Sequence, residues 1–155
     1  MEQNNLRFEC TGLTNGGCFP LDYTGRGKDL SPEFKILNLS PDAKSIIVIL
    51  EDLSHPIKGF THWVIWNIPA TSVIPEGIPH GRSVSSLNGA KQGIGYGLHK
   101  YAGTKPPKGK THKYRISIYA IDCLLNLSSF STKKNVLKAA SNHIVQRGTL
   151  KGFFE

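Results

Sequence analysis

The sequence predicts a mostly β fold. Its 155 residues include 16 Gly and 9 Pro, a content that is typical of many turns between short elements. Three segments are either continuously apolar or alternate with the period of two that β-strands show, whereas only one segment has helical spacing. We expect one domain, residues 1–155, because two domains of about half this length would each bury too small a core.

The first third of the chain contains short strands separated by turns. Residues 6–10 give a weak strand signal, and an Asn-Gly-Gly turn follows them. Residues 19–32 show no periodicity and are expected to lie as a loop over the body of the fold. A second short strand is expected at residues 35–39. Residues 45–50, SIIVIL, are apolar and mostly β-branched, which predicts a strand buried in the core.

The most strongly patterned strand is expected at residues 60–69, FTHWVIWNIP. Strict alternation places His62, Val64, Trp66 and Ile68 on one face and Trp63, Ile65 and Asn67 on the other. Both faces carry bulky side chains, which predicts a central strand. The short polar connection 51–59 favours antiparallel pairing with the strand before it. A lone imidazole in such a strand must be hydrogen-bonded or must open onto a cavity.

The remaining chain contains a long irregular region, one strand and one helix. Residues 70–109 are rich in Gly and Pro and lack helical spacing, so they are expected to form a loop system. Residues 111–122 alternate again, and this strand also begins with a histidine, His112. A helix is predicted over residues 131–148, capped by Ser131 or Thr132 and ended by Gly148, and residues 150–154 are expected to form a last strand.

Composition excludes several classes of protein. The longest clear apolar run, residues 46–50, is far shorter than the roughly 20 residues that span a bilayer. The N-terminal sequence has no cationic and apolar export signal, so a cytoplasmic location is expected. Cys10, Cys18 and Cys123 match no zinc motif and are expected to be free thiols, although a hairpin could bring Cys10 near Cys18.

The net charge of +8 is unevenly distributed. Residues 53–155 hold 14 of the 19 Lys and Arg but only 3 of the 11 Asp and Glu. Residues 82–115 contain no acidic side chain, and such a region attracts anions. A solvated basic loop without a specific partner explains this pattern equally well, and nucleic-acid binding through residues 82–115 is a further alternative.

Two expected strands begin with histidines, and one carboxylate precedes the first of them. If these strand ends are aligned in one sheet, Asp52, His62, His112 and Tyr114 converge on one opening. The prolines of the nearby sequence KPPKG, residues 105–109, would form a stiff rim. Imidazoles titrate near neutrality and donate to oxyanions when protonated, and a carboxylate supports the charged form. The combination therefore predicts a site for phosphate or carboxylate.

The order of these motifs carries a family resemblance. Asp52 with Pro56, then THWVIWNIP, then the pattern G-x-x-P-P-x-G, then HKY with the IYAID strand resemble the phosphatidylethanolamine-binding protein family, also called the Raf kinase inhibitor-like family. The similarity is strongest to its bacterial and archaeal branch and covers about residues 19–154. It implies a β-sandwich with a large central Greek-key sheet, a smaller second sheet and a C-terminal helix.

The resemblance also implies an anion pocket for phosphate, phosphoryl headgroups or small carboxylates. The residues that match the family's pocket are Asp52, Pro56, Phe60, His62, Gly103, Pro107, His112 and Tyr114. Backbone amides near Gly103 are expected to assist the imidazoles and the Tyr114 hydroxyl. His143 and Asp122 are interpreted as structural, and the loop histidines His55, His80 and His99 are expected to face solvent.

The chain departs from the family pattern at three places. Ser54 stands where a second carboxylate is usual, which should favour anions but could loosen the network around His62. Thr104-Lys105 replaces the usual Pro-Cys and adds a cation at the rim. The segment 92–101 is shorter than usual and lacks the common asparagine, with Gly95 nearest to that position.

The sequence therefore predicts a ligand-binding protein and not an enzyme, with no cofactor and no metal. Its expected ligand is a small phosphoryl or carboxylate anion, for which a phospholipid headgroup is one source, and the family resemblance implies a kinase or a protease as the protein partner. A phosphatase or esterase using Asp52 with His62 or His112 is the alternative. Against it, the sequence lacks a G-x-S-x-G motif and a Cys beside a plausible base.

Overall fold

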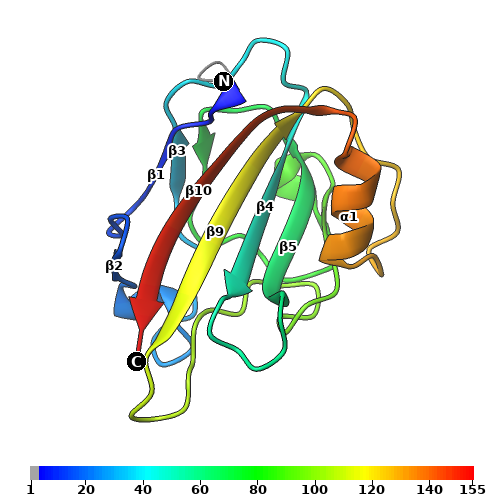
Figure 1. The fold of residues 1–155 in the computed structure, drawn as a ribbon. Coiled ribbons are helices and arrows are strands. Elements are labelled where there is room, and N and C mark those ends of the chain that lie inside the picture. The colour runs from blue at the N-terminus through cyan, green and yellow to red at the C-terminus, as the bar shows by residue number, and fades with distance from the viewer. Residues whose placement is uncertain (1–3) are drawn as a thin grey trace.

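Two β-sheets of unequal size and one short helix form the structure, a computed structural model that describes residues 4–155 (Figure 1). The large sheet has seven strands in the order β2-β10-β9-β4-β5-β8-β7, and the small sheet has the order β1-β3-β6. The strands are β1 (Phe8–Cys10), β2 (Gly17–Cys18), β3 (Phe34–Ile36), β4 (Ser45–Asp52), β5 (Phe60–Pro69), β6 (Val73–Ile74), β7 (Ser83–Val84), β8 (Ala90–Gln92), β9 (His112–Ile121) and β10 (Ile144–Phe154). The helix is α1 (Lys133–Ala140).

The centre of the large sheet is a Greek key. Strands β4, β5 and β8 lie side by side as antiparallel neighbours, although the short strands β6 and β7 come between β5 and β8 in the sequence. Strand β9 then returns to pair antiparallel with the free edge of β4. The resulting spatial order, β9-β4-β5-β8, is the 4-1-2-3 order of that motif. The expected mostly β fold with a large Greek-key sheet, a smaller second sheet and one C-terminal helix is therefore confirmed.

Both faces of the large sheet are packed against apolar side chains. The first cluster, here the sheet–sheet cluster, joins residues of the large sheet such as Val48 and Trp63 to Phe34 and Ile74 of the small sheet. The second, the helix-side cluster, joins the other face to α1 through Val136. Strand β4 lies between them and is buried at every position, which explains its continuous apolar sequence.

Strand β5 does not alternate strictly, because it contains two irregularities. Ile46 and Val48 of β4 pair with Ile68 and Ile65, so β5 has one extra residue between these pairs. Asn67 takes a positive φ of 60° there. Its side chain exchanges two 2.8 Å hydrogen bonds with the backbone of Leu125, which stabilise this conformation. As a result Ile68 joins the sheet–sheet cluster with Trp63 and Ile65, and its predicted face was wrong.

The predicted helix over residues 131–148 was too long at its C-terminal end. Thr132 caps α1 as expected, in a capping box with Asn135, but α1 ends at Ala140. Strand β10 begins at Ile144 and pairs with β9 over its whole length. Gly148 does not stop a helix, since it lies buried within this strand.

The other elements follow the predictions more closely. The expected strands at 6–10, 35–39 and 111–122 appear as β1, β3 and β9, and the region 70–109 is irregular apart from three short strands and a 3-10 turn. The three cysteines are free thiols, as expected. None of the helices in the described part of the chain has the length and apolarity needed to cross a membrane.

Candidate functional site

Three strand ends meet at one edge of the large sheet. Asp52 ends β4 and pairs in register with Phe60 at the start of β5 and with Tyr114 near the start of β9. In Figure 1 these ends lie together at the lower edge of the sheet, below the labels of β4, β5 and β9. These three strand ends are therefore aligned in one sheet, as the sequence predicted.

A cavity of about 600 Å³ opens at this edge. Its lining residues are Asp52, Ser54, His55, Pro56, Phe60, His62, Tyr96, Lys105, Pro106, Pro107, Lys110, Thr111, His112 and Tyr114. They include all the predicted pocket residues except Gly103. A second cavity of similar size, about 610 Å³, lies beside β1, but no histidine lines it. We therefore treat the cavity at the strand ends as the candidate site.

Asp52 and His112 form a hydrogen-bonded pair inside this cavity. The Nδ1 of His112 lies 2.8 Å from Oδ2 of Asp52. The other carboxylate oxygen accepts a 2.8 Å hydrogen bond from the backbone N–H of Ser54. Because a carboxylate only accepts, Nδ1 of His112 carries the proton and Nε2 is the ring nitrogen that remains for another group. Ser54 thus supports the network from its backbone, although it lacks the usual carboxylate.

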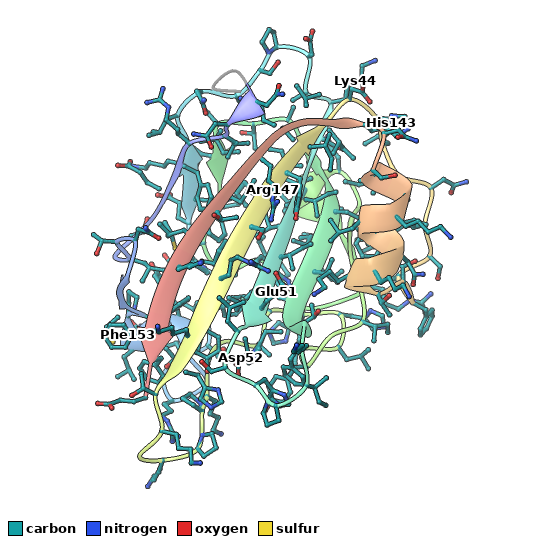
Figure 2. The ribbon with its side chains drawn as sticks, in the orientation of Figure 1. Lys44, Glu51, Asp52, His143, Arg147 and Phe153 are labelled. Atoms are coloured by element: carbon teal, nitrogen blue, oxygen red, sulfur yellow. The ribbon has the colours of Figure 1, made fainter. Side chains whose placement is uncertain are left out.

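Neighbouring Glu51 points to the opposite face of the sheet and does not enter the cavity. It forms ion pairs with Arg115, at 3.0 Å, and with Lys133 of α1. Burial alone would raise the pKa of Glu51, but these two cations outweigh burial and lower it. Figure 2 labels both carboxylates at the lower end of β4. Of the described residues, Asp52 is consequently the only carboxylate that lines the cavity.

His62 is the second imidazole of the cavity and is almost completely buried. Its Nδ1 donates a 2.9 Å hydrogen bond to the carbonyl oxygen of Ala102. Burial lowers the pKa of His62, and the Ala102 carbonyl and the Asp52 charge only partly oppose this effect. The ring is therefore neutral at neutral pH, with Nε2 as a hydrogen-bond acceptor.

A bulge in β5 turns His62 toward the cavity. Leu50 and Glu51 of β4 pair with Trp63 and Thr61, which leaves His62 as the extra residue. Its ring contacts Tyr114 edge-to-face at a centroid distance of 5.6 Å. Since Tyr114 belongs to the sheet–sheet cluster, His62 does not share a face with Val64 and Trp66, and that prediction was wrong.

Tyr114 lies between the two imidazoles at the base of the cavity. Its ring centroid is 5.6 Å from that of His62 and 6.3 Å from that of His112. Burial and the charge of Asp52 raise the pKa of Tyr114 well above its usual value. The hydroxyl therefore keeps its proton and can act as a hydrogen-bond donor.

The mouth of the cavity is aromatic and basic. His55 stacks on Phe60 at 3.8 Å between centroids with an interplanar angle of 9°, and Tyr96 is 59% exposed. Lys105 and Lys110 complete the rim. His55 therefore belongs to the site, which corrects its assignment to solvent.

Tyr96 lies in a segment without periodicity, so no sequence signal indicated that it belongs to the site. For His55 there was a usable signal, because it is next to Pro56.

Gly103 supports the cavity without lining it. Its N–H donates a 2.7 Å hydrogen bond to Oδ1 of Asp29, so this amide is occupied within the protein and is not available to a ligand. A Cβ at this position would come within 2.3 Å of the carbonyl oxygen of Tyr23. Glycine is required here because the 103–109 loop packs directly on the segment that precedes β3. Gly103 itself therefore does not supply one of the anion-binding amides expected near this position, and amides of the neighbouring loop residues stay a prediction.

The cavity residues do not resemble a metal centre. Among residues 4–155, Asp52, His62 and His112 do not form a group with the spacing of metal ligands. Asp52 and His112 are instead hydrogen-bonded to each other, and His62 is hydrogen-bonded to a backbone carbonyl oxygen. The arrangement presents two ring Nε2 atoms, one protonated phenol and two rim ammonium groups, a set that can surround a small oxyanion.

Comparisons with known proteins agree with this architecture. The family model described as phosphatidylethanolamine-binding protein matches residues 11–155. A UPF0098 protein of Pyrococcus horikoshii is 39% identical over 143 residues, which cover 91% of this chain and 72% of that protein. A UPF0098 protein of Methanothermobacter thermautotrophicus is 34% identical, with 96% and 98% of the two chains covered.

Solved structures show the same fold. The crystal structure of a putative phosphatidylethanolamine-binding protein homolog from Chlamydia trachomatis superposes with a TM-score of 0.84 at 27% identity and covers 98% of both chains. That of Escherichia coli YbcL gives a TM-score of 0.82 at 21% identity, covering 97% of this chain and 98% of YbcL, and shows the shared fold alone. The family match over residues 11–155 decides the assignment: this chain belongs to the phosphatidylethanolamine-binding protein family.

Proposed function

We propose that this chain is a binding protein for a small anion, a phosphoryl or carboxylate group, which enters the cavity beside Asp52, His62 and His112. One observation carries the proposal. Both imidazoles have their Nδ1 atoms occupied within the protein, by Ala102 and Asp52, and both rings line the same cavity. The Nε2 atoms are thus the ring nitrogens left for a ligand.

The chemistry of these atoms predicts how the anion is held. A neutral imidazole whose Nδ1 is protonated can only accept at Nε2, whereas an oxyanion needs donors. Anion binding is therefore coupled to proton uptake by the imidazoles. The protonated Tyr114 hydroxyl and the ammonium groups of Lys105 and Lys110 supply further donors and positive charge.

A titration of phosphate and phosphoethanolamine, followed by the imidazole signals in NMR, tests this proposal. Two imidazoles should respond together in the wild type. His112→Ala should lose at least about tenfold in affinity, because a charge-assisted hydrogen bond contributes about 1.5–3 kcal/mol. His80→Ala is the matched control, since His80 is exposed and lies outside the cavity. An unchanged affinity in His112→Ala would refute the proposal.

The pH dependence of binding offers an independent check. Because binding takes up protons, affinity should fall as pH rises through the histidine range. Sulfate is a useful second probe, since it does not titrate in that range. A sulfate affinity that is constant from about pH 5 to 8 would exclude the imidazoles as anion donors.

The geometry gives some support to a hydrolase as a second candidate. The Asp52–His112 pair has the arrangement of a general base held by a carboxylate. However, within the described residues no serine, threonine or cysteine is hydrogen-bonded to His112, so a protein nucleophile is missing. Turnover of a chromogenic phosphate or acyl ester that disappears in both Asp52→Asn and His112→Ala would favour this candidate.

We further propose how a larger partner reaches the site and in which compartment the protein works. A phospholipid headgroup, a kinase or a protease would reach the site through the aromatic and basic mouth formed by Phe60, Tyr96 and Lys105. The free thiols fit a reducing compartment, and we propose the cytoplasm. Nucleic-acid binding is less favoured, because Trp63 and Trp66 are buried and do not offer stacking surfaces.

A further inference from the structure

A second cluster of reactive side chains lies at the other end of the large sheet. Asp122 and Cys123 directly follow β9, and His143 directly precedes β10. The register pairs Ile121 with Ile144, so the antiparallel neighbours bring these residues together although 20 positions separate Cys123 from His143. Figure 2 shows His143 at the opposite end of the sheet from Asp52, so this cluster is separate from the anion cavity.

The backbone holds the three side chains in place. The N–H of Asp122 donates a 3.0 Å hydrogen bond to the carbonyl oxygen of His143. The hydroxyl of Ser45 donates to the carbonyl oxygen of Cys123 at 2.5 Å. Both segments are therefore fixed to the ends of paired strands, which are among the more precise supports for a binding site.

The ligand atoms of these residues are close to one another. One ring nitrogen of His143, the Sγ of Cys123 and a carboxylate oxygen of Asp122 all lie within 4.8 Å of one another. Tetrahedral zinc, with bonds of about 2.0–2.3 Å, holds its ligands roughly 3.5 Å apart. Asp122 and His143 are each about half exposed, so small side-chain rotations can close this difference.

The charges at the cluster also suit a cation. The chain has a net charge of +8, yet within the described residues no Lys or Arg forms an ion pair with Asp122. Its partner is Nδ1 of His143, at 2.8 Å. A thiolate and a carboxylate together neutralise a divalent ion, and imidazole adds a neutral ligand that zinc prefers.

We propose that Asp122, Cys123 and His143 form a binding site for a thiophilic divalent cation of the zinc type. The ion replaces the hydrogen bond between Asp122 and His143 with a bond to each of them, and the Nδ1 proton of His143 moves through solvent to Nε2, so that the ring stays neutral. The ion also displaces the thiol proton of Cys123, which is released to solvent. Three protein ligands leave the fourth tetrahedral position to water. This site is independent of the anion cavity.

Titration of the full chain with Co²⁺, a spectroscopic substitute for Zn²⁺, tests the site. Wild type should show visible ligand-field bands and a near-ultraviolet thiolate-to-cobalt charge-transfer band that saturates at one ion per chain and disappears on addition of Zn²⁺. Cys123→Ser should abolish the charge-transfer band. Cys18→Ser is the matched control, because Cys18 is an exposed free thiol outside the cluster, and this variant should keep the band.

Two further measurements make the test independent of any one variant. His143→Ala and Asp122→Asn should weaken Co²⁺ binding by at least about 10- to 100-fold, the loss that is typical when a residue supporting a metal ligand is removed, with unchanged far-ultraviolet circular dichroism. In the wild type, Zn²⁺ should slow alkylation of Cys123, measured by peptide mass, without slowing that of Cys18. A charge-transfer band that persists in Cys123→Ser, or equal alkylation of Cys123 with and without Zn²⁺, would overturn the proposal.

Discussion

At the scale of single residues, His62 is the group whose chemistry the fold changes most clearly. Its ring is buried and donates to a backbone carbonyl, and burial lowers its pKa below the usual value near 6.5. The unfolded chain therefore binds a proton at His62 more readily than the folded chain does. Protonation consequently favours unfolding, so this residue makes the folded state sensitive to acid.

We predict a pH window for this effect. The stabilisation is fully present above about pH 6.5 and is lost as pH falls toward the lower folded-state pKa of His62. His62→Asn places a side-chain NH₂ group near the position of the histidine Nδ1, where it can still donate to the carbonyl oxygen of Ala102, but an amide does not titrate. Urea unfolding between about pH 7.5 and 5.5 should therefore show a shallower pH dependence for His62→Asn than for the wild type.

The exposed residue His80 supplies the comparison for this measurement. His80→Asn should retain the wild-type pH dependence, because His80 is exposed in a loop and lies outside the cavity that holds His62. Equal slopes for the wild type and His62→Asn would show that His62 titrates alike in the folded and unfolded chain.

At the scale of elements, β10 depends on a glycine that allows another segment to approach. A Cβ at position 148 would lie 2.1 Å from the carbonyl oxygen of Leu6, whose N–H in turn donates to the carbonyl oxygen of Arg147. Gly148→Ala should therefore push the N-terminal segment away and destabilise the protein by about 1–3 kcal/mol. The denaturant midpoint measures this loss, and Thr149→Ala on the exposed face of β10 should change it much less.

The same glycine explains why the C-terminal part of the fold was mispredicted. A Gly that follows Arg147 is typical of the end of a helix. In the structure, however, a glycine is needed at this position because Leu6, from a segment more than 130 residues away in the sequence, packs against it. Sequence periodicity cannot report such a contact. The β-branched pair Ile144-Val145 was the local signal that favoured a strand instead.

Elsewhere, local sequence was sufficient to predict the main strands and part of the candidate site. The apolar run of β4 and the histidines that begin or enter β5 and β9 predicted three aligned strand ends with Asp52, His62 and His112 among them. The bulges in β5 were not predictable, because Asn67 takes its conformation from bonds to the distant Leu125 backbone. Tyr96 reaches the mouth through a loop path that periodicity does not specify.

At the scale of the whole molecule, the two apolar clusters share the same central strands. Strand β4 contributes Val48 to the sheet–sheet cluster and Ile49 to the helix-side cluster, and β5 contributes Trp63 and Trp66 in the same way. Because β4 and β5 contribute side chains to both clusters, these strands cannot leave one cluster without also exposing the apolar side chains of the other. We therefore propose that the chain unfolds as one cooperative domain.

The two tryptophans allow this last proposal to be tested, because the chain contains no others and each reports on one cluster. Trp63→Phe leaves Trp66 as the probe of the helix-side cluster, and Trp66→Phe leaves Trp63 as the probe of the sheet–sheet cluster. Trp63→Phe should lose about 1–3 kcal/mol, because the buried Gln92 oxygen that accepts the Trp63 N–H at 2.8 Å then lacks its partner. Trp66→Phe removes a buried N–H that has no partner within the described residues, so no hydrogen bond is lost there.

Within each variant, the fluorescence and far-ultraviolet circular dichroism transitions in urea should nevertheless coincide, since both clusters lose their packing together. Separate midpoints in either variant would mean that one cluster unfolds before the other, and the helix-side cluster, with its single short helix, would then be the part expected to open first.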